Sequence, residues 1–210
     1  MQDKYLKNKE RLLNGDLKEA KTFFAKNGYT LEYAYCKLLE DDLKGAKQLF
    51  SRTKDFDNRA LWGYKIVSIL QKKFTTEEIN YDEMPTFFQL RNFLEVDLSL
   101  LMKYNKGNYV EILCAYSDIF ASINAESYKF YARAFHFNHY PQFAQFFANK
   151  AKDFFYNDPE LHYHIALMKF DNGELEDAKK YCLSCLHILK EYFPAVNMLN
   201  KLAIGNPASQ

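Results

Sequence analysis

The pattern of apolar and polar positions repeats with a fixed period in the segment 125–190. Each repeat has apolar residues at helical spacing in a first helix and small residues in a second helix, and His162 of the second repeat corresponds to Tyr128 of the first. The first repeat consists of Tyr128, Tyr131, Ala132, Phe135, Ala144, Ala148 and Ala151, and the second of His162, Ile165, Ala166, Lys169, Ala178, Cys182 and Cys185. A period of about 34 residues is typical of helix-turn-helix units that must stack to bury their apolar faces.

A related pattern with a shorter period occupies residues 1–72. The set Ala20-x-x-x-Phe24 recurs as Ala46-x-x-x-Phe50, and each belongs to an apolar stripe on a predicted helix. Turn signals separate these helices at Asn14-Gly15, Asn27-Gly28 and Asp41-Asp42. We therefore expect short helical repeats over 1–72, thinner than the later ones.

One glycine lies inside a predicted helix of this region, the helix 58–72. Gly63 follows Trp62 there, and glycine in a helix interior costs about 1 kcal/mol relative to alanine. We expect a close approach of another helix to compensate for that cost.

The pattern lapses at 73–86, which we interpret as a joint between two halves. Beyond it, the pattern predicts helices over 87–104 and 109–123, helix pairs over 125–156 and 159–190, and a last helix from Phe193 to Leu202. That last helix would cover the exposed end of the stack, so that 87–204 forms one set of longer repeats. The tail 205–210 is predicted to be disordered.

Composition supports an all-α, globular protein and lowers the expectation of nucleic-acid binding. The hydrophobic share is 48%, and 7 Gly and 5 Pro are too few for the frequent turns of an all-β protein. The net charge of +1 lacks the basic excess typical of nucleic-acid binding. The polar start, Met1 to Arg11, does not resemble a signal peptide, and no apolar run is long enough to span a membrane. We expect a cytoplasmic protein with no membrane or nucleic-acid partner.

The four cysteines include a C-x-x-C, Cys182 and Cys185, a spacing also found in zinc and redox sites. A second pair is missing, and both cysteines take the positions that Ala148 and Ala151 occupy one period earlier. Because a free cysteine behaves as a small buried hydrophobe, core packing is the favoured interpretation.

The segment 125–190 resembles the tetratricopeptide repeat family, whose pattern W-x₂-L-G-x₂-Y…A-x₃-F…P has the same period. Tyr128-x₂-Tyr131-Ala132-x₂-Phe135…Ala144 matches it, and the next unit matches at Ile165-Ala166, Gly173 and Ala178 but departs at Lys169. A weaker unit covers about 93–124. The resemblance implies a right-handed α-α solenoid of antiparallel helix pairs, whose concave surface, lined by the first helix of each pair, binds a peptide or partner segment.

Spacing along the first helices selects nine candidates for that surface. If the motif residues face the paired helix, one neighbouring face carries a cationic set flanked by aromatic and aliphatic residues. The set comprises Lys129, Arg133 and His136 in the middle, Tyr163, Leu167 and Phe170 one unit later, and Asp97, Leu101 and Tyr104 one unit earlier. Such a surface suits an acidic or amphipathic peptide. The alternative is an ordinary solvated face with aromatics that pack between repeats.

No motif in the sequence proposes catalysis. The histidines His136, His139, His162 and His164 lack metal-site spacing, and phosphate-binding or nucleophile motifs are missing. We therefore expect no enzyme activity, no metal and no cofactor. The leading hypothesis is a scaffold that binds a protein or peptide; the alternatives are a self-assembling homo-oligomer and, more weakly, a reader of single-stranded RNA.

Overall fold

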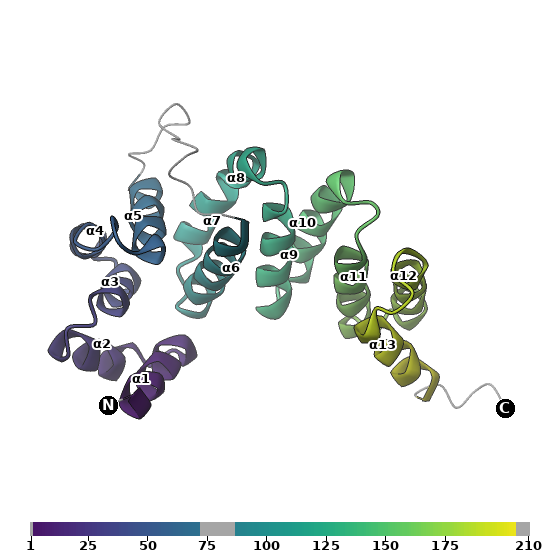
Figure 1. Ribbon diagram of the computed structural model, residues 1–210, viewed down its shortest axis with the longest axis horizontal. Coiled ribbons are helices and arrows are strands. Elements are labelled where there is room, and N and C mark those ends of the chain that lie inside the picture. Colours follow the sequence, from purple (N-terminus) through teal and green to yellow (C-terminus); the bar gives the residue numbers. More distant parts are fainter. Residues whose placement is uncertain (1, 72–86, 205–210) are drawn as a thin grey trace. The chain divides into compact units, whose positions relative to one another are not determined.

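The computed structural model describes residues 2–71 and 87–204, and within these ranges the chain forms thirteen α-helices and no strand (Figure 1). The prediction of an all-α protein is therefore confirmed. The predicted joint 73–86 and the predicted tail 205–210 lie outside the described residues. None of the described helices combines the length and the apolar character needed to cross a membrane.

The chain divides into two compact units, residues 1–127 and 128–210. The first contains α1 (Gln2–Asn14), α2 (Leu17–Lys26), α3 (Thr30–Leu39), α4 (Leu43–Phe50), α5 (Asn58–Leu70), α6 (Phe87–Lys103), α7 (Gly107–Ala115) and α8 (Ser117–Ile123). The second contains nearly all of α9 (Ser127–Phe137), followed by α10 (Pro141–Phe154), α11 (Pro159–Asp171), α12 (Leu175–Ile188) and α13 (Phe193–Ile204).

This division differs from the expected boundary at 73–86. The helix after that segment, α6, is bound to the helices before it, since Asp97 contacts residues of α3 and α5. Tyr104, directly after α6, bonds to the end of α1. These long-range bonds join α1–α5 and α6–α8 into one unit, and the boundary falls after Ser127 instead.

The same turn joins consecutive helices at six places: α1–α2, α2–α3, α3–α4, α6–α7, α9–α10 and α11–α12. In each turn one residue has a positive φ, at Gly15, Gly28, Asp41, Asn105, His139 and Gly173. The next residue's N–H bonds to the carbonyl five residues earlier, in the pairs Asp16–Arg11, Tyr29–Phe24, Asp42–Lys37, Lys106–Leu101, Tyr140–Phe135 and Glu174–Lys169, at 2.8–3.1 Å. This is the Schellman helix ending, which satisfies the last carbonyls of a helix and reverses the chain.

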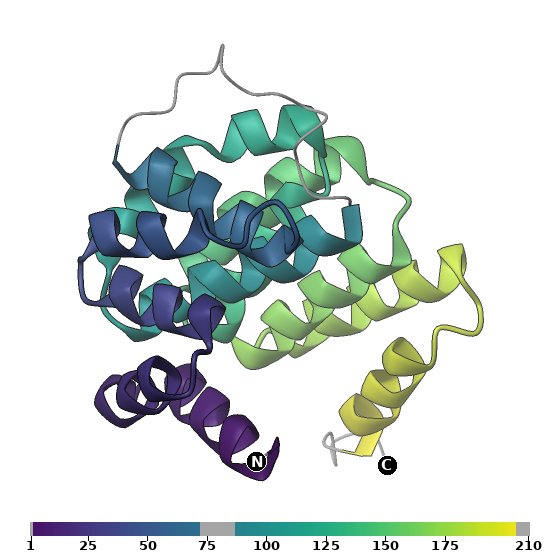
Figure 2. The ribbon, with the colours of Figure 1, turned by 60° about the vertical axis from the view of Figure 1, so that its left-hand side comes forward.

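The spacing of these turns extends the longer period beyond the segment where the sequence showed it most clearly. The interval from Asn105 to His139 equals the interval from His139 to Gly173, and both equal the period of 125–190. Three pairs therefore share the longer period, including α6–α7, where the sequence match was weak. In the first unit the turns at Gly15 and Asp41 follow the shorter period, and consecutive helices from α1 to α5 pack side by side (Figure 2).

The small residues of the second unit fill the helix interfaces, as predicted. Ala144, Ala148 and Ala151 of α10 and their counterparts Ala178, Cys182 and Cys185 of α12 are all fully buried. The cysteines are free thiols, and burial raises the pKa of Cys182 and of Cys185 to about 11, which disfavours the reactive thiolate. Core packing is confirmed as their structural role.

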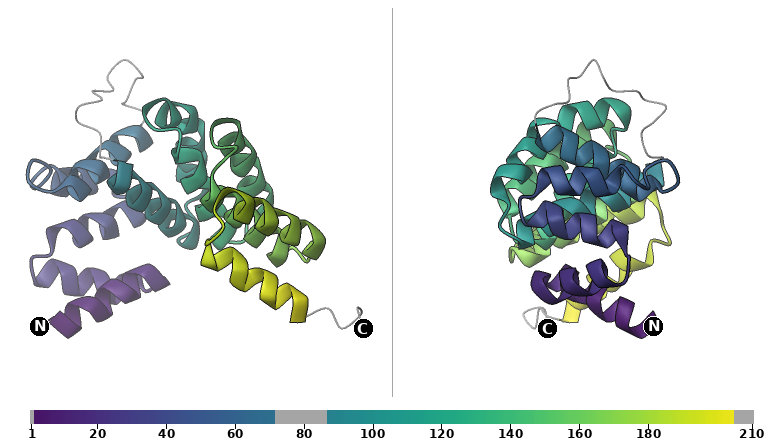
Figure 3. Two further views of the ribbon diagram at one scale, coloured as in Figure 1. Left: turned by 45° about the vertical axis from the view of Figure 1, so that its right-hand side comes forward. Right: turned by 90° about the vertical axis from the view of Figure 1, so that its left-hand side faces the viewer.

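The last helix, α13, packs against α12 and extends the core of that pair (Figure 3). Its residues Ala195 and Met198 are buried together with Ala166, Cys182 and Cys185. The predicted final helix is therefore present, and it continues beyond Leu202 to Ile204.

Gly63 does accommodate a close neighbour, but the neighbour is a side chain. A Cβ at this position would lie 2.5 Å from Cε1 of Phe50, a fully buried ring of α4. Glycine lets α5 pack directly onto that ring.

One predicted helix is divided in two. The expected helix 109–123 is α7 and α8, which meet at Tyr116, where φ −92° and ψ 3° fall outside the helical region. Nothing in the apolar pattern marked this break.

Candidate partner-binding surfaces

The nine residues predicted to line a concave surface belong to both units. Asp97 and Leu101 of α6 lie in the first together with Tyr104, which directly follows α6, and the other six, on α9 and α11, lie in the second. We describe the two groups separately.

Asp97 is 2% exposed and serves as a buried acceptor for two other helices. Its Oδ2 accepts hydrogen bonds from Nε1 of Trp62 at 2.8 Å and from the Tyr35 hydroxyl at 3.4 Å. Its Oδ1 is bound by the guanidinium of Arg59. The expectation that Asp97 lies on an exposed surface is wrong, because its carboxylate fastens α6 to α3 and α5.

Aromatic rings and opposite charge compensate the buried ions of this cluster. The Arg59 guanidinium lies over the rings of Tyr35 and Phe93, with its carbon 4.8 and 4.6 Å from the centroids. Burial raises the pKa of Asp97, against the opposing effect of Arg59 and the Trp62 indole N–H. Burial likewise raises the pKa of Tyr35 well above its usual range.

The sequence carried a weak signal for this cluster. Asp97 stands between Leu94, Leu98 and Leu101 on an otherwise apolar stripe, where an acidic residue needs a buried partner. The partner Arg59 is 38 residues away, so pattern alone could not assign it.

The other two residues of this group, Leu101 and Tyr104, also make contacts inside the first unit. Leu101 is buried, which excludes it from a partner surface. The Tyr104 hydroxyl donates to the carbonyl of Leu12 at 2.8 Å and so satisfies the end of α1. Burial raises the pKa of Tyr104 to about 12.

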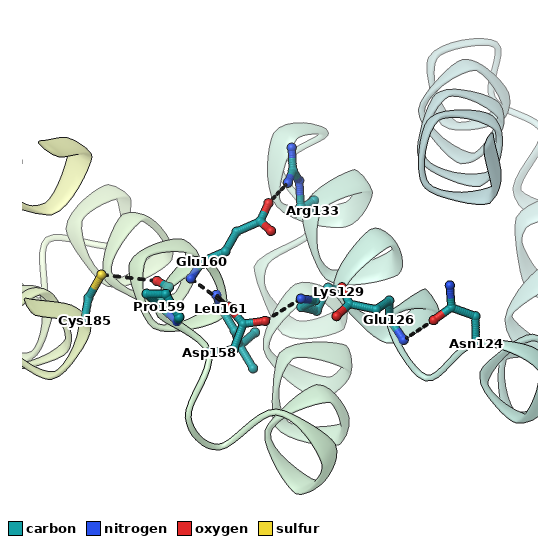
Figure 4. A network of polar contacts seen from close by, with 9 residues as sticks. All are labelled: Asn124, Glu126, Lys129, Arg133, Asp158, Pro159, Glu160, Leu161 and Cys185. Carbon is teal, nitrogen blue, oxygen red and sulfur yellow. Dashed lines mark hydrogen bonds and ion pairs between the residues drawn. The ribbon is translucent and has the colours of Figure 1, made fainter. Parts of the chain in front are cut away.

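Three side chains of α9, two of them cations and the third a histidine, contact carboxylates at α11 in a row (Figure 4 shows the first two). Lys129 Nζ is 2.5 Å from Asp158 Oδ2, Arg133 Nη1 is 2.7 Å from Glu160 Oε1, and His136 Nε2 is 2.9 Å from Asp171 Oδ2. We call these six residues the α9–α11 ladder. The carboxylates of Asp158 and Glu160 offset the charges of Lys129 and Arg133, so the predicted cationic middle is not a positively charged surface.

Lys129 and Asp158 form the most buried step of the ladder. Lys129 is 6% exposed, and its ammonium also lies 4.6 Å from the ring centroid of Phe155. Asp158 caps α11 by accepting from the N–H groups of Glu160 and Leu161 at 2.8 and 3.2 Å. Burial would raise the pKa of Asp158, but Lys129 and the two backbone N–H groups hold it below its usual value.

Most of the α11 side of the predicted surface packs between helices. Tyr163 and Leu167 are partly buried against the core of α11, α12 and α13, and the Tyr163 ring lies 5.5 Å from that of Tyr192. Phe170, at 37% exposed, is the one member of the nine that the structure classes as exposed. Most of these side chains therefore pack between helices, which is the alternative that the sequence left open.

The histidines occupy structural positions in the second unit. His164 is buried, and burial, helped by His136 and Arg133, lowers its pKa to about 3, so it stays neutral at physiological pH. Its ring meets that of His136 edge-on at 5.0 Å. His139 provides the positive φ of a turn, and His162 bonds to the Tyr156 carbonyl. Within 2–71 and 87–204, no three His, Cys, Asp or Glu residues are grouped so as to hold a metal ion.

An open groove of about 420 Å³ lies between α12 and α13, a site that the apolar pattern did not identify. Leucines dominate its lining, with a few polar residues beside them: Leu175, Glu176, Lys179, Leu183, Leu199, Asn200, Leu202 and Ala203. Leu175 and Leu183 are both exposed. The signal available in the sequence was this leucine pair, whose spacing places both on one helix face.

Comparisons with models of protein families, with curated proteins and with solved structures found no match for this chain.

Proposed function

We propose that this protein is a non-enzymatic scaffold that binds a segment of a partner protein, built as a right-handed solenoid of helix pairs similar to tetratricopeptide repeats. One observation carries the proposal: the same Schellman turn joins consecutive helices at six places, and three of these turns are spaced at the longer period. A repeated pair that stacks on its neighbours produces an extended surface, and repeat proteins use such surfaces to bind partners.

The face of α11 is the part of the predicted surface that remains available. Phe170 is exposed there, and the carboxylates of Glu160 and Asp171 in the ladder are more exposed than the side chains that they contact. This combination favours an apolar partner residue flanked by neutral or basic residues rather than the acidic peptide expected from the sequence. A charged residue at position 170 should prevent such binding, because it cannot be desolvated against an apolar side chain.

The test is capture of partners from native lysate on the full chain and on the Phe170→Glu variant, followed by binding measurements with each purified partner. We expect partners of the α11 face to be lost on Phe170→Glu. The matched control is Phe193→Glu, which introduces the same charge at a more exposed phenylalanine of α13. Equal binding by the unmodified chain and both variants, with unchanged helicity, would contradict the assignment of the partner to this face.

The groove between α12 and α13 favours a second candidate, a homo-oligomer. Leu175 and Leu183 are exposed beside Leu199 and Leu202, and an exposed apolar end of a repeat stack is a site for self-association. Light scattering across a range of protein concentrations measures this directly. If the groove forms an oligomer, the mass should rise with concentration and Leu183→Glu should hold it at the monomer value; a constant monomer mass in the unmodified chain removes this candidate.

A further inference from the structure

Two lysine ammonium groups meet on one tyrosine ring in the first unit. Tyr64 of α5 has the Nζ of Lys47, from α4, at 4.8 Å from its ring centroid, and the Nζ of Lys54, from the turn before α5, at 5.0 Å. The electron-rich ring attracts each ammonium. Both ammonium groups lie about 5 Å from the same ring centroid, so they are at most about 10 Å apart, and like charges repel. An anionic segment that contacts both would relieve that repulsion.

The residues around Tyr64 supply little negative charge. In the described part of the chain Lys47 has no carboxylate partner, and Lys54 is 3.9 Å from the exposed Asp55. Asp57 caps the N-terminus of α5, where its carboxylate accepts hydrogen bonds from the N–H groups of Arg59 and Ala60. The carboxylates near Lys47 and Lys54 therefore leave these ammonium groups largely uncompensated.

Two further cations extend this region. Lys44 precedes Lys47 by one helical turn, which places both on one face of α4. Arg52 lies in the turn that also carries Lys54. Both are exposed, and neither forms an ion pair within the described residues. We call Lys44, Lys47, Arg52, Lys54 and Tyr64 the α4–α5 cationic face.

An apolar side chain stands in the same turn. Phe56 is 92% exposed, although its backbone is fixed by a hydrogen bond from its N–H to the Thr53 carbonyl at 3.0 Å. A single exposed phenylalanine is common on protein surfaces. Next to Lys54, however, it offers an apolar contact beside the cations.

We propose that the α4–α5 cationic face binds a short acidic segment of a partner protein, with carboxylates at Lys47 and Lys54 and an apolar residue on Phe56. Charge complementarity selects the acidic segment, since the uncompensated ammonium groups are close enough for neighbouring carboxylates of one peptide. This inference concerns a different surface from Phe170 and holds whether or not the α11 face binds a partner.

A peptide fits this face better than a nucleic acid. Nucleic-acid binding relies on a basic excess along a phosphate track, whereas this chain has a net charge of +1. Asp41 and Asp42 lie at the start of α4, just before Lys44, and Asp55 lies beside Lys54, so carboxylates border the cationic face on both sides. A compact acidic segment avoids these carboxylates more readily than a long polyanion.

The experiment measures binding of a fluorescent synthetic peptide to the full chain by anisotropy. The peptide carries four glutamates around one Leu-Phe pair, and its control carries glutamines in their place. We expect the acidic peptide to bind at least tenfold more tightly than its control and to weaken as salt increases.

The variants locate the binding. Lys47→Gln with Lys54→Gln should weaken the acidic peptide at least tenfold, and Phe56→Ser should weaken it severalfold. Lys18→Gln with Lys26→Gln removes the same charge from exposed positions of α2 and should change affinity less than twofold. Phe170→Glu should also leave it unchanged, which separates this proposal from the α11 face.

Three outcomes would overturn the proposal. The first is equal affinity for the acidic and glutamine peptides. The second is an equal loss of affinity in the two double-lysine variants, which would show that binding depends only on net charge. The third is tighter binding of a single-stranded RNA oligonucleotide that depends on Lys47 and Lys54, which would make this face a nucleic-acid interface. Circular dichroism of each variant verifies that the helices are retained.

Discussion

The two units use charge differently although the same turn joins their helix pairs. In the first unit a carboxylate lies in the core, where Asp97 of α6 binds Arg59, Trp62 and Tyr35. In the second unit the ion pairs form a ladder between α9 and α11, and its carboxylates become more exposed from Asp158 to Asp171. A charge in a core must have every partner in place, while a partly hydrated pair tolerates loss. The first unit should therefore depend much more on its charges.

The short-period helices of the first unit are also shorter than most helices of the second unit. Helices α2, α3 and α4 have 10, 10 and 8 residues, whereas α10, α11 and α12 have 14, 13 and 14. The longer helices account for the change from the shorter to the longer period, because the joining turn stays the same. Longer helices also provide room for a ladder of three steps along one face.

The largest effect should come from removing the buried acceptor. Asp97→Ala leaves the Arg59 guanidinium and the Trp62 indole N–H without their partner, and we expect the first unit to lose about 3–5 kcal/mol of unfolding free energy. Trp62 is the sole tryptophan of the chain, so its fluorescence during denaturation follows the first unit.

The matched control is Asp171→Ala in the ladder. Its carboxylate is 59% exposed, and we expect a loss below about 1 kcal/mol, measured by circular dichroism. Equal losses from the two substitutions would contradict the contrast between a core charge and a ladder charge.

An intermediate effect should follow pH in the second unit. The pKa of His164 is about 3 in the folded chain and 6.5 ordinarily, so between these values the unfolded chain binds a proton that the folded chain does not. This histidine therefore costs no stability above pH 6.5 and reduces stability as pH falls below it. The expected cost between pH 7 and pH 5 is about 2 kcal/mol, since each pH unit below the ordinary value contributes about 1.4 kcal/mol.

Denaturation of the unmodified chain and of His164→Gln at pH 7 and pH 5 measures this cost. The variant should lose less stability on acidification by about the same 2 kcal/mol. His187→Gln, at an exposed position of α12, should lose as much stability between pH 7 and pH 5 as the unmodified chain. A parallel pH dependence in all three proteins would mean that His164 is protonated in the fold.

Among the changes to buried positions, the smallest effect should come from Gly63→Ala. The added methyl would meet the Phe50 ring at 2.5 Å, and overpacking of a core costs about 1–3 kcal/mol, while alanine regains about 1 kcal/mol of helix propensity. We expect a net loss of about 1 kcal/mol in the Trp62 transition. In a chain that already carries Phe50→Leu, adding Gly63→Ala should cause no further loss of stability. If Gly63→Ala lowers stability equally with and without Phe50→Leu, the clash with the Phe50 ring is not the cause.

Local patterns in the sequence determined the helices and their turns. Apolar spacing located most helices of the described ranges, although not the break between α7 and α8. The pairs Asn14-Gly15, Asn27-Gly28 and Asp41-Asp42 marked three of the six repeated turns. The recurrence at the longer period also predicted which small residues are buried, including Cys182 and Cys185. These features depend on backbone geometry and on side chains within one or two helical turns, which a sequence records directly.

Only the tertiary structure decided which charged residues are available to a partner. Lys129 and Arg133 occupy a helix face that looked solvated, yet carboxylates 29 and 27 residues later neutralise them. Asp97 likewise belongs to the core because Arg59 and Trp62 come from another helix. Whether a charged side chain is buried or exposed depends on the partners that packing brings to it. The Coulomb energy of an ion pair depends on the distance between the two charges in space, and the period of a sequence does not specify that distance.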